Sequence, residues 1–149
     1  MTGSGLPPIV RTLSVPAPPD RAFQAFTEHI GEWWDTDFTA FSADFTTAVI
    51  EPKEGGRVYE ANAKGGEYDW GTVTVWQPSE RVALHWGLGL GPDADTEVEL
   101  TFTGDGDGTT VHFEHRGWGA GQGHDRAKFD DSGGWDVLLA AYEDYVSAS

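Results

Sequence analysis

One stretch near the C-terminus decides the fold: Ser132-Gly133-Gly134-Trp135-Asp136-Val137-Leu138-Leu139-Ala140-Ala141-Tyr142-Glu143-Asp144-Tyr145-Val146. Its apolar residues recur at intervals of three and four, which is the spacing of one face of an α-helix and predicts a helix over about 132–147. The apolar stripe consists of Trp135, Leu138, Leu139, Tyr142 and Val146. This is the one long helical pattern in the chain, so we expect it to cover the sheet that the other segments form.

The remaining segments predict strands, with two short helices near the N-terminus. Residues 9–15 alternate with period two, as a strand does. Prolines end this strand, and apolar spacing then predicts a short helix over 19–29 and a turn or short helix at 32–35. Six more strands are expected over 45–51, 57–62, 68–77, 81–87, 96–103 and 109–117, and a glycine-rich loop over 119–131. Because consecutive hairpins give antiparallel sheets, we expect an α+β fold, a curved antiparallel sheet of about seven strands wrapped around the C-terminal helix.

Composition narrows the class of protein. The 149 residues have the size of one ordinary domain, and we expect a single domain over 1–149 with residues 1–8 flexible. The chain has no cysteine, which excludes disulfides and thiolate chemistry. A net charge of -16, from 25 acidic against 9 basic residues, argues against nucleic acids and anionic membrane surfaces as partners. No apolar run approaches the roughly 18 residues of a membrane helix, and no secretory signal is visible, so we expect a cytoplasmic protein.

Strand alternation identifies two ionisable residues among apolar neighbours. Glu60 shares a predicted strand face with Val58, and His115 shares one with Phe113. A buried ionisable side chain costs several kcal/mol unless it is paired or neutral. Glu60 and His115 are therefore candidate orienting or catalytic groups of a site. The alternative is that each of them satisfies loop backbone groups at the rim of the sheet.

Tryptophan is the compositional outlier, with seven residues in the chain. An indole offers a large apolar body and a single N–H donor. Two interpretations are open: the indoles line a cavity for a flat or apolar ligand, or they pack the core. For the first interpretation, the predicted cavity residues are Trp34, Val58, Glu60, Trp86, Phe113, His115, Trp118, Trp135, Leu138 and Tyr142.

No motif indicates a metal or a cofactor. His112 and His115 lie three apart on a predicted strand, which puts them on opposite faces. His115, His124 and Asp125 follow no standard metal-ligand spacing. The stretch Asp105-Gly106-Asp107-Gly108 lacks the further ligands of a calcium loop and favours a hairpin turn. We therefore expect neither a metal nor a cofactor.

Several stretches resemble, in their order along the chain, one superfamily of proteins. They are the strand-to-helix entry Val15-Pro16-Ala17-Pro18-Pro19-Asp20-Arg21-Ala22-Phe23, the short second helix Ile30-Gly31-Glu32-Trp33-Trp34, the hairpin Glu51-Pro52-Lys53-Glu54-Gly55-Gly56-Arg57-Val58, the stretch from Trp70-Gly71-Thr72-Val73 through Gln77-Pro78-Ser79-Glu80-Arg81-Val82 to Trp86, and the last strand and helix entry in Gly108-Thr109-Thr110-Val111, His115-Arg116-Gly117-Trp118 and Gly134-Trp135. The chain is thereby similar to the SRPBCC superfamily, also called START-like or birch-pollen-allergen-like. Within it, the chain resembles the bacterial branch related to the C-terminal domain of the Hsp90 ATPase activator. The resemblance covers nearly the whole chain and implies the helix-grip fold.

The resemblance also implies an apolar cavity between sheet and helix, which the superfamily uses for lipids, sterols, polyketides and plant hormones. We therefore expect a protein that binds a small hydrophobic or aromatic molecule, with Glu60 and His115 as orienting groups and residues 119–131 as a mobile entrance. One alternative is an enzyme of the cyclase, dehydratase or hydrolase kind, in which His115 is a general acid or base polarised by Glu60.

The other alternative is a protein-interaction module. It predicts an exposed apolar patch on the outer face of the sheet, formed by Trp70 and Trp76. A homodimer is one such option. A chaperone partner is not expected, because the eukaryotic activator domain works alongside a separate N-terminal domain for which this chain has no room.

Overall fold

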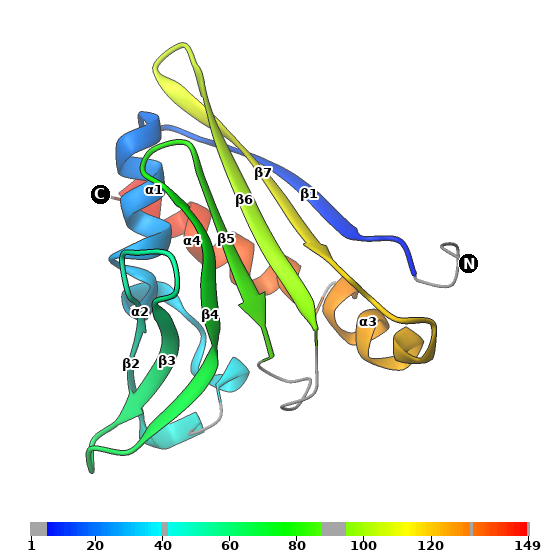
Figure 1. Cartoon of the computed structure of the whole chain (residues 1–149). Coiled ribbons are helices and arrows are strands. Elements are labelled where there is room, and N and C mark those ends of the chain that lie inside the picture. Colours follow the sequence, from blue (N-terminus) through cyan, green and yellow to red (C-terminus); the bar gives the residue numbers. More distant parts are fainter. Residues whose placement is uncertain (1–5, 40–41, 88–94, 132, 149) are drawn as a thin grey trace.

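The computed structural model describes residues 6–39, 42–87, 95–131 and 133–148. Within them, seven antiparallel strands form one sheet in the order β1-β7-β6-β5-β4-β3-β2, which curls around helix α4 (Figure 1). The strands are β1 (Ile9–Val15), β2 (Phe45–Ile50), β3 (Arg57–Asn62), β4 (Glu67–Gln77), β5 (Arg81–Trp86), β6 (Thr96–Asp105) and β7 (Gly108–Arg116). The helices are α1 (Pro19–Thr27), α2 (Ile30–Trp33), α3 (Gly123–Asp130) and α4 (Trp135–Ala148), with short 3-10 turns η2 (Thr36–Phe38), η3 (Ser42–Asp44) and η4 (Ala120–Gln122). The predicted α+β helix-grip fold is confirmed.

Helix α4 buries the face that its sequence predicted. All five residues of the apolar stripe are buried against the sheet and α1. The phenol of Tyr142 donates a hydrogen bond of 2.7 Å to the carbonyl of Ala22, which ties α4 to α1. Burial of such a stripe supplies most of the stability of a helix of this length. None of the described helices is long and apolar enough to cross a membrane.

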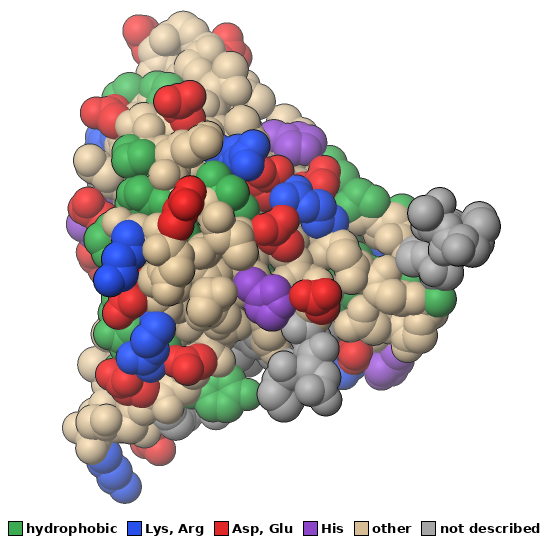
Figure 2. All heavy atoms as spheres, in the orientation of Figure 1, with side chains coloured by type: hydrophobic (Ala, Val, Ile, Leu, Met, Phe, Trp, Pro, Cys, Tyr) green, Lys and Arg blue, Asp and Glu red, His purple; other side chains and the backbone are tan. Residues whose placement is uncertain are grey.

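The strands from β5 to β7 follow the predicted alternation. The side chains of Leu84, Leu100 and Phe113 point inward and are fully buried. Strands β6 and β7 meet at a tight turn, where Asp105 pairs with Gly108 and Gly106 adopts a φ of 64°, a conformation that glycine takes without strain. Figure 2 shows the outer face of the sheet, where charged side chains of both signs are interspersed and hydrophobic ones are scattered.

Strand β4 departs from simple alternation. Register shifts occur on both of its edges, between Val58 and Tyr59 in the pairing with β3 and between Val73 and Val75 in the pairing with β5. A bulge inserts one unpaired residue and turns the following side chains to the other face. As a result Trp70 is buried with 1% of its surface exposed. The prediction that Trp70 lies on the outer face is wrong for this reason.

Trp76, the other residue of the predicted outer patch, is partly buried. Its ring packs edge-on against Phe23 of α1, with 5.1 Å between centroids. The side chain therefore contacts the helix layer. Together with the burial of Trp70, this contact removes the exposed apolar patch that the interaction-module hypothesis predicted.

The segment 119–131 is largely helical, contrary to the expected loop. It contains η4 and α3. Helix α3 has no fully buried residue, so it lacks the apolar stripe that sequence periodicity detects. Polar contacts hold it instead: Arg126 donates to the carbonyls of Pro7 and Pro8, and Asp130 forms an ion pair with Arg11 at 2.9 Å.

The chain around α3 is tightly connected at both ends. The backbone N–H of Leu6 donates to the carbonyl of Trp118 at 3.0 Å. Gly134 is buried at the start of α4, where a Cβ atom would collide with the backbone carbonyls of Lys128 and Phe129. Of the segment 1–8, for which we expected flexibility, residues 1–5 lie outside the described part of the chain.

Candidate functional site

Four indoles meet in the interior between the sheet and α4. Trp34 follows α2, Trp70 lies on β4, Trp86 ends β5 and Trp135 begins α4. Their ring centroids are 4.7 to 6.1 Å apart in the five contacts that join them. We call these four residues the tryptophan cluster. Three of them belong to the predicted cavity set, and Trp70 was missed because the bulges in β4 reverse its direction.

Three of the four indole N–H groups of the tryptophan cluster have a hydrogen-bond acceptor among the described residues, and that of Trp86 does not. Trp34 donates to the carbonyl of Phe38 at 3.1 Å, and Trp70 donates to Oε1 of Glu60 at 2.7 Å. Trp135 donates to Nδ1 of His115 at 3.0 Å. Nε1 of Trp86 is buried and has no hydrogen-bond partner among the described residues. A buried donor without an acceptor costs about 1–3 kcal/mol, so this unpaired N–H group lowers the stability of the folded protein.

His115 is the centre of a hydrogen-bonded chain that crosses the interior. Because an indole N–H can only donate, Nδ1 of His115 accepts from Trp135 and carries no proton. The proton of the neutral ring is therefore on Nε2, which donates to Oγ1 of Thr96 at 2.9 Å. The hydroxyl of Thr96 in turn donates to the carbonyl of Trp86 at 2.9 Å. This chain fixes the tautomer of His115 and links α4 to β5, β6 and β7.

Burial keeps the imidazole of His115 neutral. The side chain is fully buried, and desolvation lowers its pKa to about 3. At neutral pH the ring is therefore not a proton donor of the imidazolium kind. Both of its nitrogens are engaged, so transfer of a proton to or from another molecule would first require a hydrogen bond to Trp135 or Thr96 to break. This geometry suits a residue that positions the indole of Trp135.

Glu60 is also fully buried, and it faces the same interior. Its Oε1 atom accepts the hydrogen bond of Trp70. The structure thus brings each of the two candidate polar residues against a different indole of the tryptophan cluster. Their predicted inward direction is confirmed, while their part in binding or catalysis stays a prediction.

The other predicted cavity residues lie at different distances from the tryptophan cluster. Phe113 and Trp118 pack near the cluster, with Phe113 at 4.7 Å from Trp135 and Trp118 at 4.4 Å from His115. Tyr142 lies further along α4 and packs against Phe26 at 5.7 Å. Val58 and Leu138 are buried in the same core.

Phe129 is a neighbour of the cluster that the sequence did not reveal. Its ring lies 5.3 Å from that of His115 and 6.0 Å from that of Trp135. Phe129 also lines a pocket of about 240 Å³ together with Phe38, Lys128 and Gly134. We call this the α3 pocket. Since Phe129 touches Trp135 and the carbonyl of Phe38 accepts from Trp34, the α3 pocket adjoins the tryptophan cluster.

The described residues contain no group of three or more histidine, aspartate or glutamate side chains that could hold a metal ion. The tryptophan cluster and its neighbours consist of aromatic rings with a few buried polar atoms, among them those of Glu60 and His115.

The family is decided by sequence. The profile described as activator of Hsp90 ATPase homolog 1-like protein matches residues 16–147. The chain belongs to this family. No curated protein matches the chain significantly.

Solved structures share the fold of this chain. CalC from Micromonospora echinospora, a self-sacrificing resistance protein, is 26% identical, with a TM-score of 0.70 over 95% of each chain. The Aha1 dimer from Colwellia psychrerythraea is 22% identical, with a TM-score of 0.63 over 95% of this chain and 97% of the other. Txn09, an anthrahydroquino-gamma-pyrone synthase, is 24% identical, with a TM-score of 0.59 over 96% of this chain and 99% of the other.

Proposed function

We propose that this protein binds a small hydrophobic or aromatic molecule between the sheet and α4, at the tryptophan cluster. The observation that carries the proposal is the buried N–H of Trp86, which has no acceptor among the described residues. Native proteins pair almost all buried donors, and an unpaired one calls for an explanation such as a missing ligand atom. An acceptor atom of a ligand would remove the cost of this unpaired donor.

The surroundings of Trp86 indicate the chemistry of the ligand. Its ring is 5.7 Å from that of Trp70 and 5.3 Å from that of Trp135, so a molecule that reaches the N–H must contact aromatic rings. Planar aromatic molecules stack well on indoles. The unpaired donor adds the requirement for an oxygen or nitrogen acceptor. A planar aromatic ligand with a carbonyl or phenolic oxygen satisfies both conditions.

The α3 pocket is the proposed entrance. Trp34 lies beside this pocket, because its N–H donates to the carbonyl of Phe38, and its ring contacts those of Trp70 and Trp86. It is supported by α2, a helix of four residues, and not by a strand of the sheet. We expect a ligand to enter by displacing the Trp34 indole.

The similar structures lend support of a general kind. The name of Txn09 specifies an aromatic pyrone synthase, and CalC is named as a resistance protein. Of the two names, that of Txn09 specifies a class of small molecule. The proposed recognition of a planar aromatic compound with oxygen atoms is consistent with the name of Txn09.

Isothermal titration calorimetry with two matched probes tests the proposal. Anthraquinone-2-sulfonate and anthracene-2-sulfonate have the same ring system and charge, and only the former carries the two quinone oxygens. We expect the unmodified protein to bind the quinone more tightly. Trp86→Phe keeps an aromatic ring but removes the N–H, and should weaken quinone binding about tenfold, the equivalent of one hydrogen bond.

The control variant is Trp76→Phe, which makes the same change at a ring that packs on Phe23 outside the cluster. It should leave both affinities unchanged. Absence of binding by either probe, or an equal loss for both probes in Trp86→Phe, would contradict the proposal.

A further inference from the structure

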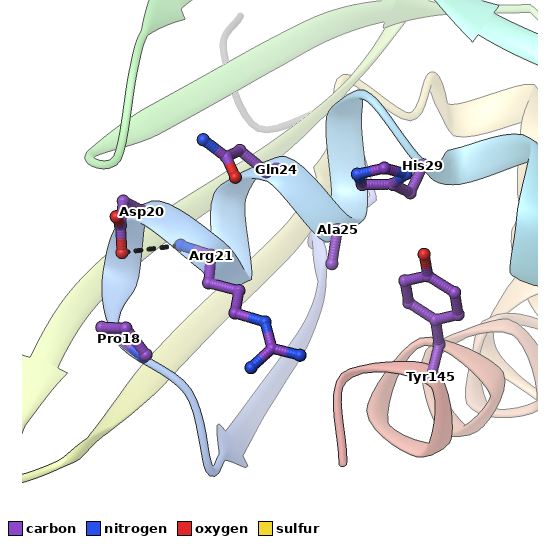
Figure 3. A pocket seen from close by; sticks show the side chains of 7 residues that line it. All are labelled: Pro18, Asp20, Arg21, Gln24, Ala25, His29 and Tyr145. Atoms are coloured by element: carbon purple, nitrogen blue, oxygen red, sulfur yellow. Dashed lines mark hydrogen bonds between the residues drawn. The ribbon is translucent and has the colours of Figure 1, made fainter. Parts of the chain in front are cut away.

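A second pocket, of about 320 Å³, lies between α1 and α4 and shares no residue with the tryptophan cluster or the α3 pocket (Figure 3). We call it the α1 pocket. Most of its wall comes from one side of α1 and the residues that flank this helix, and Tyr145 of α4 closes the other side. The lining residues are Pro18, Asp20, Arg21, Gln24, Ala25, His29 and Tyr145.

Arg21 is the distinctive residue of the α1 pocket. Five of the six arginines in the chain form ion pairs with carboxylates. The guanidinium of Arg21 makes neither an ion pair nor a hydrogen bond with any residue in the described ranges. Its side chain extends from α1 toward the Tyr145 side of the pocket (Figure 3). Among the described residues, Arg21 is thus the one arginine without a carboxylate partner, and it lines a pocket.

The nearby carboxylates already have donors of their own. Oδ1 of Asp20 accepts the backbone N–H of Arg21 at 2.8 Å, in the first turn of α1. Glu32 accepts from Nδ1 of His29 at 2.5 Å and from the phenol of Tyr145 at 3.1 Å. These bonds lower the pKa of Glu32, the bond from His29 most strongly, and hold its carboxylate between α2 and α4. Neither Asp20 nor Glu32 forms an ion pair with the guanidinium of Arg21.

The pocket combines this cation with apolar surface. Pro18, Ala25 and the ring of Tyr145 contribute carbon atoms, and the ring of Tyr145 lies tilted under the ring of His29 with 6.1 Å between centroids. A guanidinium presents its N–H groups as a planar fork that matches the two oxygens of a carboxylate. A volume of about 320 Å³ accommodates a molecule of roughly the size of one ring with a short substituent.

We propose that the α1 pocket binds a small organic carboxylate, with the carboxylate on the guanidinium of Arg21 and the hydrocarbon part against Ala25 and the ring of Tyr145. This site is separate from the one under the proposed function, and neither requires the other. It gives the protein a second ligand of a different chemical class, an acid at the surface between α1 and α4 in addition to a planar aromatic in the interior.

An NMR titration with sodium benzoate at constant ionic strength tests the inference. The ¹H–¹⁵N resonance of Nε in Arg21 reports on the guanidinium directly, and we expect it to shift saturably. Arg21→Gln should weaken benzoate binding at least tenfold, as read from the backbone amides of Gln24 and His29. Arg57→Gln is the matched control, because it removes the same charge from an arginine that is exposed on the outer strands and paired with Glu67 and Asp69.

Three results would overturn the inference. One is the absence of a saturable shift at Arg21. Another is an equal loss of affinity in Arg57→Gln, which would indicate a general effect of net charge. The third is binding of inorganic phosphate as tightly as benzoate, which would indicate an unspecific anion contact.

Two further variants keep the result interpretable. Arg21→Lys retains the charge without the planar fork and should bind benzoate with intermediate affinity, which a mere loss of folding would not produce. Trp86→Phe should leave the benzoate-induced shift of the Arg21 Nε resonance unchanged, because the α1 pocket contains no residue of the tryptophan cluster. Failure of this inference is therefore distinguishable from failure of the proposed function.

Discussion

The buried neutral state of His115 makes the stability of the protein depend on pH in a way that can be calculated. Burial lowers the pKa of His115 from 6.5 to about 3. Between these values the unfolded chain binds a proton that the folded protein does not bind. The free energy of unfolding therefore falls as the pH falls from about 6.5 toward 3, and above 6.5 the residue has no effect.

The size of this effect follows from the two pKa values. Each pH unit within the window corresponds to about 1.4 kcal/mol for one group. Between pH 7 and 4.5, His115 should lower the free energy of unfolding by about 2.5 kcal/mol. Carboxylates titrate in the same range, so the contribution of His115 must be isolated as a difference between two proteins.

His115→Gln supplies that difference, because glutamine does not titrate and keeps a polar group near Thr96. Urea unfolding, followed by tryptophan fluorescence, gives the free energy of unfolding of both proteins at a series of pH values from 7 to 4.5. We expect the advantage of the unmodified protein to shrink by about 2.5 kcal/mol over this range. A constant difference between the two proteins would refute the reasoning, since His115 would then protonate as readily in the folded protein as in the unfolded chain.

Three further predictions concern the stability or ligand affinity of substituted proteins. Trp135→Phe and Trp86→Phe delete the same atoms from two fully buried indoles, but only Trp135→Phe removes a hydrogen bond. Urea unfolding should therefore show Trp135→Phe to be less stable than Trp86→Phe by about 1–3 kcal/mol. Equal losses would contradict the hydrogen bond from Trp135 to Nδ1 of His115. Gly134→Ala places a Cβ against the carbonyls of Lys128 and Phe129, and should lower the free energy of unfolding by about 1–3 kcal/mol, which an unchanged thermal midpoint would disprove. Trp34→Ala should cost about 3–5 kcal/mol of stability yet bind anthraquinone-2-sulfonate more tightly, because the displaced indole is already gone; weaker binding in calorimetry would show that Trp34 contacts the ligand instead of blocking it.

Much of the fold could be predicted because α4 and several strands bury residues at the regular spacing of a helix or a strand. The stripe from Trp135 to Val146 has the period of a helix that packs on one side, and the structure buries all of it. Strands β6 and β7 alternate between more and less buried residues, so the inward direction of Phe113 and His115 followed from counting residues. In β5 three consecutive residues, 82–84, are buried, but counting from Leu84 still placed Trp86 inward. The inward direction of Glu60 followed in the same way.

The wrong predictions concern segments whose structure depends on contacts with residues far away in the sequence. The bulges in β4 turned Trp70 inward, and a bulge depends on pairing with neighbouring strands that alternation within one strand does not show. Helix α3 was missed because ion pairs and hydrogen bonds to residues far away in sequence, such as Arg11, hold it in place. Phe129 was missed with it.

The site was only partly predictable for a related reason. Counting residues placed Trp86 and His115 on the inner face, but which indole donates to which acceptor depends on the relative position of α4 and the sheet. The unpaired N–H of Trp86 is visible only in three dimensions. A homodimer, a cytoplasmic location and the absence of a chaperone partner stay predictions.

If the N–H of Trp86 is the polar anchor of a ligand in the interior, the indole region of a ¹H–¹⁵N spectrum will report it. The Nε1 proton of Trp86, assigned by its absence in Trp86→Phe, should resonate upfield in the free protein, as expected of an N–H without an acceptor. Saturation with anthraquinone-2-sulfonate should move this resonance downfield, and anthracene-2-sulfonate should not. A Trp86 resonance that responds identically to both probes, or to neither, would contradict the account.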